Sequence, residues 1–228
     1  SLAGYMPVWE PLLIYALGTL WYGLFNWFWF WIWREQPLRE SLSLLYRELA
    51  DYCEAKYSLL TQHTDPEKAL PPLLVRQQKA VDLITQCYQQ MHMLSAQNNT
   101  DYKRMLRIFQ EALDLQEHIS VSLHQPEEVQ KLVERSHAEE VIRWNAQTVA
   151  ARLRVLADDI LYHRLPTRFT MEKQIGALEK IARQHPDNPV GQFCYWHFSR
   201  IARVLRTQKP LYARDLLADK QRRMPLLP

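Results

Sequence analysis

Few residues of this chain have the spacing that a catalytic or metal site requires. Cys194 and His197 stand three apart on a predicted helix, a spacing that suits two metal ligands, but no second pair accompanies them. We therefore expect His197 to pack in the core beside Phe193 and Ile201. The other seven histidines are scattered over predicted loops and helix ends, and none forms a nucleophile–base or zinc-protease motif. The sequence predicts no catalytic residue, no metal site and no cofactor.

The remaining polar candidates also favour structure over chemistry. The three cysteines are an odd number without a CxxC pair, which is typical of reduced, buried thiols: Cys53, Cys87 and Cys194. The acid pairs Glu139-Glu140 and Asp158-Asp159 point in different directions on a helix, so we expect solvated faces there. Residues 34–228 carry a net charge of only +4 and no basic-aromatic binding motif, which disfavours a nucleic-acid partner. These groups predict a protein that is not an enzyme.

Glycine usage restricts the fold that must position these residues. The chain has five glycines, and none lies between Gly23 and Gly176. Tight hairpins, phosphate-binding loops and dinucleotide-binding folds need residues that accept positive φ. No segment shows the alternating pattern of a strand, so the sequence predicts an all-α fold. We expect one transmembrane helix followed by a cytoplasmic antiparallel helical bundle.

The predicted membrane segment is unusually aromatic. Residues 11–33 carry no charge, and five of the eight tryptophans fall between Trp21 and Trp33. A helix of that length extends about 34 Å, enough for a hydrocarbon layer of roughly 30 Å. A buried helix in a soluble domain is the disfavoured alternative, because the aromatic rings point all around the helix axis. Inside the span, Asn26 is expected to bond to a neighbouring helix or, less favoured, to line a transport path with Trp27 and Trp31.

Charge predicts the orientation of this span. Glu10 precedes it without any cation, whereas Arg34 and Arg39 follow it closely. Basic residues are retained on the cytoplasmic side, so we expect everything after Arg34 in the cytoplasm. Trp33 suits the inner membrane interface and Trp9 the outer one. The predicted first domain is therefore residues 1–36, the span with its charged elbow.

Helical periodicity predicts a bundle over residues 37–209. The clearest run is spaced 4-3-4-3-4 from Ile142 to Ile160, the seam of a helix packed nearly parallel to its partners. Pro71 and Pro72 predict that the second bundle helix starts near Leu73. Its periodicity predicts a buried face made of Leu74, Val81, Ile84, Tyr88 and Met91. The other helices are expected at 38–60, 102–119, 125 onward, 171–183 and 189–206, with a last short one after Pro210.

The C-terminal stretch is strongly basic. Between residues 200 and 223 the net charge is +6, and its cations are Arg200, Arg203, Arg206, Lys209, Arg214, Lys220, Arg222 and Arg223. A solvated helix face explains any single one of them. As a group they also fit a juxtamembrane patch that faces anionic lipid head groups. In that interpretation residues 210–228 lead to a further membrane region outside this chain.

Two features together resemble a known family. The elbow Arg34-Glu35-Gln36-Pro37-Leu38 follows an aromatic span, and a helical domain with the stretch His185-Pro186-Asp187-Asn188-Pro189-Val190-Gly191 comes after it. This order resembles the YccS/YhfK-type proteins of the fusaric-acid-resistance-like (FUSC) family, with the YhfK type nearest, over the whole chain. The resemblance implies a multi-pass bacterial inner (plasma) membrane protein of two similar halves. It also implies efflux of aromatic carboxylic acids driven by the proton gradient.

The predicted function is therefore a segment of a polytopic membrane transporter that exports small aromatic or organic acids. Since the first and last residues do not look like natural termini, we expect a piece of a longer protein. Its partners would be the lipid bilayer with its anionic head groups, other membrane helices of the same protein, and further copies in a homo-oligomer. The bundle would assemble subunits or gate the pore. One alternative is a membrane-anchored helical interaction module without transport, and another is an extracytoplasmic sensor bundle with inverted topology.

Overall fold

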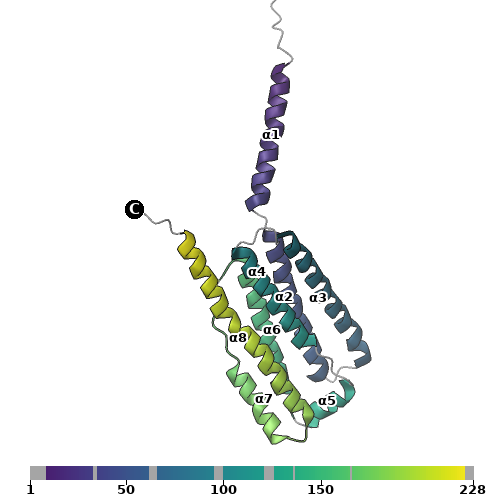
Figure 1. Ribbon diagram of the computed structural model, residues 1–228. Helices are drawn as coiled ribbons and strands as arrows, with labels where there is room; N and C mark the ends of the chain where they lie inside the picture. Colours follow the sequence, from purple (N-terminus) through teal and green to yellow (C-terminus); the bar gives the residue numbers. More distant parts are fainter. Residues whose placement is uncertain are drawn as a thin grey trace, which may run out of the picture. The chain divides into compact units, whose positions relative to one another are not determined.

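In the computed structural model every regular element of the described residues is an α-helix, which confirms that the fold is all-α. The described residues are 9–32, 35–61, 66–94, 100–120, 126–135, 137–164 and 166–223. The chain divides into two compact units, residues 1–37 and 38–228. The helices in chain order are α1 (Trp9–Ile32), α2 (Gln36–Thr61), α3 (Pro66–Leu94), α4 (Thr100–Ser120), α5 (Pro126–Arg135), α6 (Glu139–Leu161), α7 (Glu172–Gln184) and α8 (Pro189–Arg223) (Figure 1).

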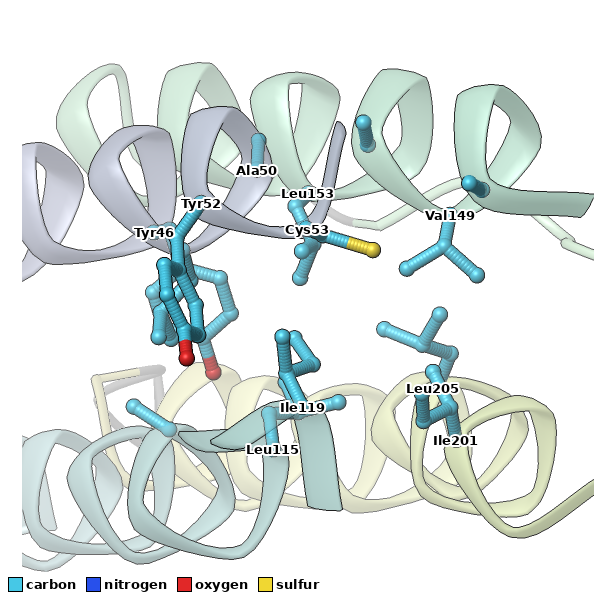
Figure 2. Packing of buried hydrophobic residues seen from close by; sticks show 14 of the residues in the cluster. Tyr46, Ala50, Tyr52, Cys53, Leu115, Ile119, Val149, Leu153, Ile201 and Leu205 are labelled. Carbon is cyan, nitrogen blue, oxygen red and sulfur yellow. The ribbon is translucent and has the colours of Figure 1, made fainter. Parts of the chain in front are cut away.

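The second unit has a core formed by one face of each of its long helices. Figure 2 shows side chains of α2, α4, α6 and α8 pointing toward one another, with Cys53, Ile119, Leu153 and Ile201 among them. The run from Ile142 to Ile160 on α6 is buried at all six of its apolar positions, which confirms the predicted seam. Leucines of α2 belong to the same core cluster, and they share one helix face because they are spaced three and four residues apart.

Helix α3 differs from the prediction in its start and in its buried face. It runs unbroken through Pro71 and Pro72, because their neighbours are exposed and water can bond to the carbonyls that lose a partner. Its fully buried residues are Ala80, Cys87 and Met91. The predicted inward residues Leu74, Val81 and Tyr88 are exposed, so this part of the prediction was wrong. The apolar residues of α3 occupy more than one face of the helix, and the face that packs against the bundle is not the predicted one.

Helix α8 begins as predicted and ends later than predicted. Asn188 caps it, since its side-chain Oδ1 accepts a hydrogen bond from the Val190 N–H at 3.0 Å. The helix then passes Pro210 and ends at Arg223, although a break at Pro210 was predicted. The lost hydrogen bond is the one to the Arg206 carbonyl, and Arg206 lies on the exposed side of the helix, where water can replace it.

Helix α1 is apolar and exposed. Its described side chains, Trp9 and residues 11–29, are all exposed, including six leucines and isoleucines and eight aromatic residues among the large ones. None of the helices within the described ranges combines the length and the mean hydropathy that a membrane span needs. The predicted span at 11–33 is therefore not confirmed by this criterion, and its last residue, Trp33, lies outside the described part.

Candidate functional site

The residues predicted for the membrane segment lie on α1. Asn26 and Trp27 are exposed, Trp27 by 67%, and Trp9 at the start of the helix is exposed as well. Phe25 and Trp29 stack with their ring centroids 5.9 Å apart, as residues four apart on a helix can. The backbone of Trp31 belongs to α1, whereas its side chain, Trp33 and Arg34 fall outside what the structure describes. The exposed aromatic helix can contact lipid or other helices.

Arg39, predicted as an orientation signal beside the membrane, is buried at the start of the bundle. It is only 7% exposed and belongs to the buried face of α2. Its neighbours in the chain, Leu38 and Leu42, are part of the hydrophobic core. Arg39 therefore contributes to the packing of α2, and its part in setting membrane orientation stays a prediction.

The basic residues of α8 divide into a described and an undescribed group. Arg200, Arg203 and Arg206 are exposed, and the Arg200 guanidinium lies 4.3 Å from the ring centroid of Trp196. The backbones of Lys209, Arg214, Lys220, Arg222 and Arg223 continue the same helix, but their side chains lie outside the described part. The structure thus assembles at least three exposed cations on the first half of α8.

Two adjoining hollows lie where the segment between α6 and α7 meets α8. Each has a volume of about 430 Å³, and both are lined by Phe169, Thr170, Glu172 and Arg206. Arg152, Arg168 and Leu205 line one hollow only, and Arg203 lines the other. Residues from three distant parts of the sequence therefore converge here, which the sequence did not predict.

Arg152 is held firmly at the hollow that it lines together with Arg168 and Leu205. Its side chain is buried, with only 5% exposed. Its guanidinium donates hydrogen bonds to the Thr167 hydroxyl at 3.2 Å and to the Thr167 carbonyl at 2.9 Å. It also lies 5.2 Å from the ring centroid of Phe169, within cation–π range. These contacts fix both the arginine and the segment that follows α6.

A second group of polar residues lies inside the core. The Lys56 ammonium donates a hydrogen bond to the Ile119 carbonyl near the end of α4, where the helix dipole favours a cation. Burial lowers the pKa of Lys56 to about 8 and, together with the nearby Lys56 charge, lowers the pKa of His197 to about 3. The thiols of Cys53 and Cys194 close by are buried, and burial raises the pKa of each to about 12. At neutral pH these thiols and the imidazole are uncharged.

This core group confirms the structural interpretation of His197. Its ring stacks on Phe193 with centroids 5.4 Å apart and is only 1% exposed. All three cysteines are buried and unpaired as thiols. Within the described ranges no three histidine, cysteine or carboxylate side chains group as metal ligands would.

The second acid pair of α6, Asp158-Asp159, differs from its predicted role in one of its two residues. Asp158 is half-exposed and pairs with Arg47 at 2.6 Å, but Asp159 is buried at the edge of the core. Burial raises the pKa of Asp159, and the nearby guanidinium of Arg152 opposes that shift. The expectation of a solvated face was wrong for Asp159. Its position three residues after Leu156, beside the seam, is the signal that could have shown this.

The comparisons with known proteins identify a family. The sequence matches the family described as FUSC-like inner membrane protein yccS over residues 1–216. No solved structure matches the chain. The match supports the YccS-type assignment, while the nearer resemblance to the YhfK type stays a prediction. Because the matched segment covers nearly the whole sequence, the chain belongs to the FUSC-like family of inner membrane, transporter-like proteins.

Proposed function

We propose that this chain is part of an exporter of small aromatic or organic acids, with α1 in the membrane and the bundle in the cytoplasm. Membership of an inner membrane family supports the membrane location. In this proposal Asn26, Trp27 and Trp31 contact other membrane helices or the transported acid. The bundle of residues 37–209 assembles subunits or gates the path, and residues 210–228 lead back to the bilayer.

The observation that carries this proposal is the exposure of α1. Its described side chains from Pro11 to Trp29 are all exposed and none of them is charged. Burying apolar surface is worth about 25 cal/mol per Å², so a helix of this composition gains free energy by leaving water. In an inner membrane protein, lipid and neighbouring membrane helices can cover this apolar surface.

The modest hydropathy of α1 is compatible with this role. Its average is lowered by tryptophan and tyrosine, whose rings combine a large apolar body with one polar atom, and by Asn26. In a multi-pass protein such residues can face other helices, where the Asn26 amide and the Thr19 hydroxyl find partners. Within α1 the Thr19 hydroxyl already donates to the Tyr15 carbonyl at 2.9 Å. We therefore propose that α1 is a membrane helix covered partly by protein.

The outer face of α3 supports the assembly role, and we propose that a second copy of the chain covers it. Leu74, Val81 and Tyr88 are exposed at seven-residue spacing, as in a helix that packs along another helix. An antiparallel pair centred on Val81 sets Leu74 against Tyr88 of the other copy. In a parallel pair each of these residues would instead lie against its own equivalent. We propose the antiparallel arrangement, in which a tyrosine ring meets a leucine at both ends.

Export is the direct test of the proposed function. In bacteria that lack the full-length protein, restoring it should lower the cellular accumulation of an aromatic acid such as radiolabelled benzoate. Trp27→Ala and Asn26→Leu should weaken this effect, and Trp144→Ala is the matched control because Trp144 is an exposed tryptophan of the bundle. If restoring the protein changes accumulation of no aromatic acid tried, the transport claim fails and the interaction-module alternative takes its place.

Topology is tested separately with introduced cysteines. The three native thiols are buried, so a membrane-impermeant maleimide should label only a new, exposed cysteine such as Lys180→Cys. In intact cells this residue should stay unlabelled, and it should react once the cells are opened. Labelling from outside would place the bundle on the other side of the membrane.

The α3 interface is tested by cross-linking in membranes. Val81→Cys should form disulfide-linked dimers, because a disulfide needs Cα atoms within about 7 Å. Leu74→Cys alone should not, since 14 residues separate it from its equivalent in the other copy, about 21 Å along the pair. Mixing Leu74→Cys with Tyr88→Cys should restore the link. Cross-linking of Leu74→Cys alone contradicts the antiparallel arrangement, and no link at any position contradicts the interface.

A further inference from the structure

One of the two hollows beside α8 has an excess of positive charge. Arg152, Arg168 and Arg206 line it, and the carboxylate on its wall is that of Glu172. The structure contains no ion pair for Arg168 or Arg206 within the described ranges. The neighbouring hollow instead balances Arg203 and Arg206 against Glu172 and Glu179. The two hollows therefore have similar volumes and different charge.

The charged hollow also has an apolar wall and hydroxyl groups. Phe169 and Leu205 supply apolar surface, and Thr167 and Thr170 supply hydroxyls. The guanidinium of Arg152 is already oriented by its two hydrogen bonds to Thr167 and by the Phe169 ring. A buried arginine held in this way loses little conformational entropy when an anion arrives.

We propose that this hollow binds a small anion that combines a carboxylate or phosphate group with an apolar body. Arginine suits both groups because its planar donors match two oxygens at once. The charged end of the ligand would face Arg168 and Arg206, and its apolar body would lie against Phe169 and Leu205. The site belongs to the second unit of the chain, whereas the proposed transport residues belong to the first, so it goes beyond the proposed transport function. Anion binding there would tie the segment between α6 and α7 to α8.

Binding of benzoate to the full chain in detergent is the test. Titration calorimetry should detect binding of benzoate. It should detect no binding of benzamide, which has a similar shape but no charge. Arg168→Ala should weaken benzoate binding about tenfold, because one charge-assisted hydrogen bond is worth about 1.5 kcal/mol or more. Arg203→Ala, in the neutral hollow, is the matched control and should change the affinity less than twofold. Both arginines are exposed, so neither substitution should disturb the fold.

The source of the anion is decided by two further arms. Inorganic phosphate should compete with benzoate if a free anion fits the hollow. If the ligand is instead a lipid head group, phosphatidylglycerol nanodiscs should abolish benzoate binding while phosphatidylcholine nanodiscs leave it intact. Failure of benzoate and phosphate to bind in detergent, or equal loss of affinity in Arg168→Ala and Arg203→Ala, would overturn the site. None of these results depends on export, so the proposed function stands or falls independently.

Discussion

Helix α1 and the seam helix α6 place their apolar side chains in opposite ways. On α6 the six seam residues, spaced 4-3-4-3-4 from Ile142 to Ile160, are buried on one face, whereas Trp144, Val155 and Arg154 lie on more exposed sides. On α1 the apolar and aromatic side chains surround the helix, and the described ones are all exposed. The seam of α6 is therefore covered by its own chain. Helix α1, which is apolar on every side, needs a cover that the described residues do not supply.

The strongest test of this comparison is a pair of matched leucine truncations. Leu153→Ala should reduce the free energy of unfolding of the bundle by about 2–5 kcal/mol, because it leaves a cavity at a fully buried position. Leu17→Ala, at a position that is 62% exposed, should change it by less than about 0.5 kcal/mol. Denaturant unfolding of the chain in detergent, followed by circular dichroism, measures both. Equal losses would mean that α1 is as much a part of the core as α6.

A smaller effect concerns the buried imidazole of His197. Its pKa is about 3 in the folded chain and near 6.5 in the unfolded chain, so below pH 6.5 only the unfolded chain takes up the proton. The stability that depends on this group is complete above pH 6.5 and is lost as the pH falls toward 3. At pH 5.5 the loss is about 1.4 kcal/mol relative to neutral pH. His197→Phe, which keeps the stack on Phe193, should remove this component.

The measurement is the difference between the two chains, since other groups titrate in the same range. Unfolding free energies of the parent and of His197→Phe are compared at pH 7.5, 6.5 and 5.5. The gap between them should change in favour of the variant as the pH falls. A constant gap would mean that the imidazole is accessible to protons in the folded bundle, despite Tyr57 and Phe193 beside it.

The smallest expected loss of stability distinguishes two arginines on the bundle surface, Arg154 and Arg47, by the number of carboxylates that each one bonds. Arg154 bonds to Asp51 at 2.8 Å and to Glu54 at 2.6 Å, and these hydrogen bonds raise its pKa. Arg47 bonds to a single carboxylate, Asp158. All of these groups are partly exposed, so water weakens the pairs. Arg154→Ala should lower the midpoint of denaturation by the equivalent of about 1 kcal/mol and Arg47→Ala by less than about 0.5 kcal/mol.

Added salt provides the control for these pairs. At 1 M sodium chloride the gap between Arg154→Ala and the parent should narrow, since salt screens exposed charges. A gap that persists unchanged would show that the Arg154 side chain stabilises α2 and α6 through packing of its methylene groups. Helix α1 differs from the bundle in this respect, because it has no charged residue between Pro11 and Trp29 that could form such a pair.

Sequence patterns alone were enough to predict the helical class, the seam of α6, the cap of α8 at Asn188 and the burial of His197. These features depend on local rules, namely side-chain periodicity and capping, which act within a few residues. Long-range packing set which face of α3 is buried and placed Arg39 and Asp159 inside. It also brought together the arginines that line one hollow, namely Arg152, Arg168 and Arg206. Such outcomes depend on neighbours far away in the chain, and a helix with apolar residues on several faces takes the one that its partners fit.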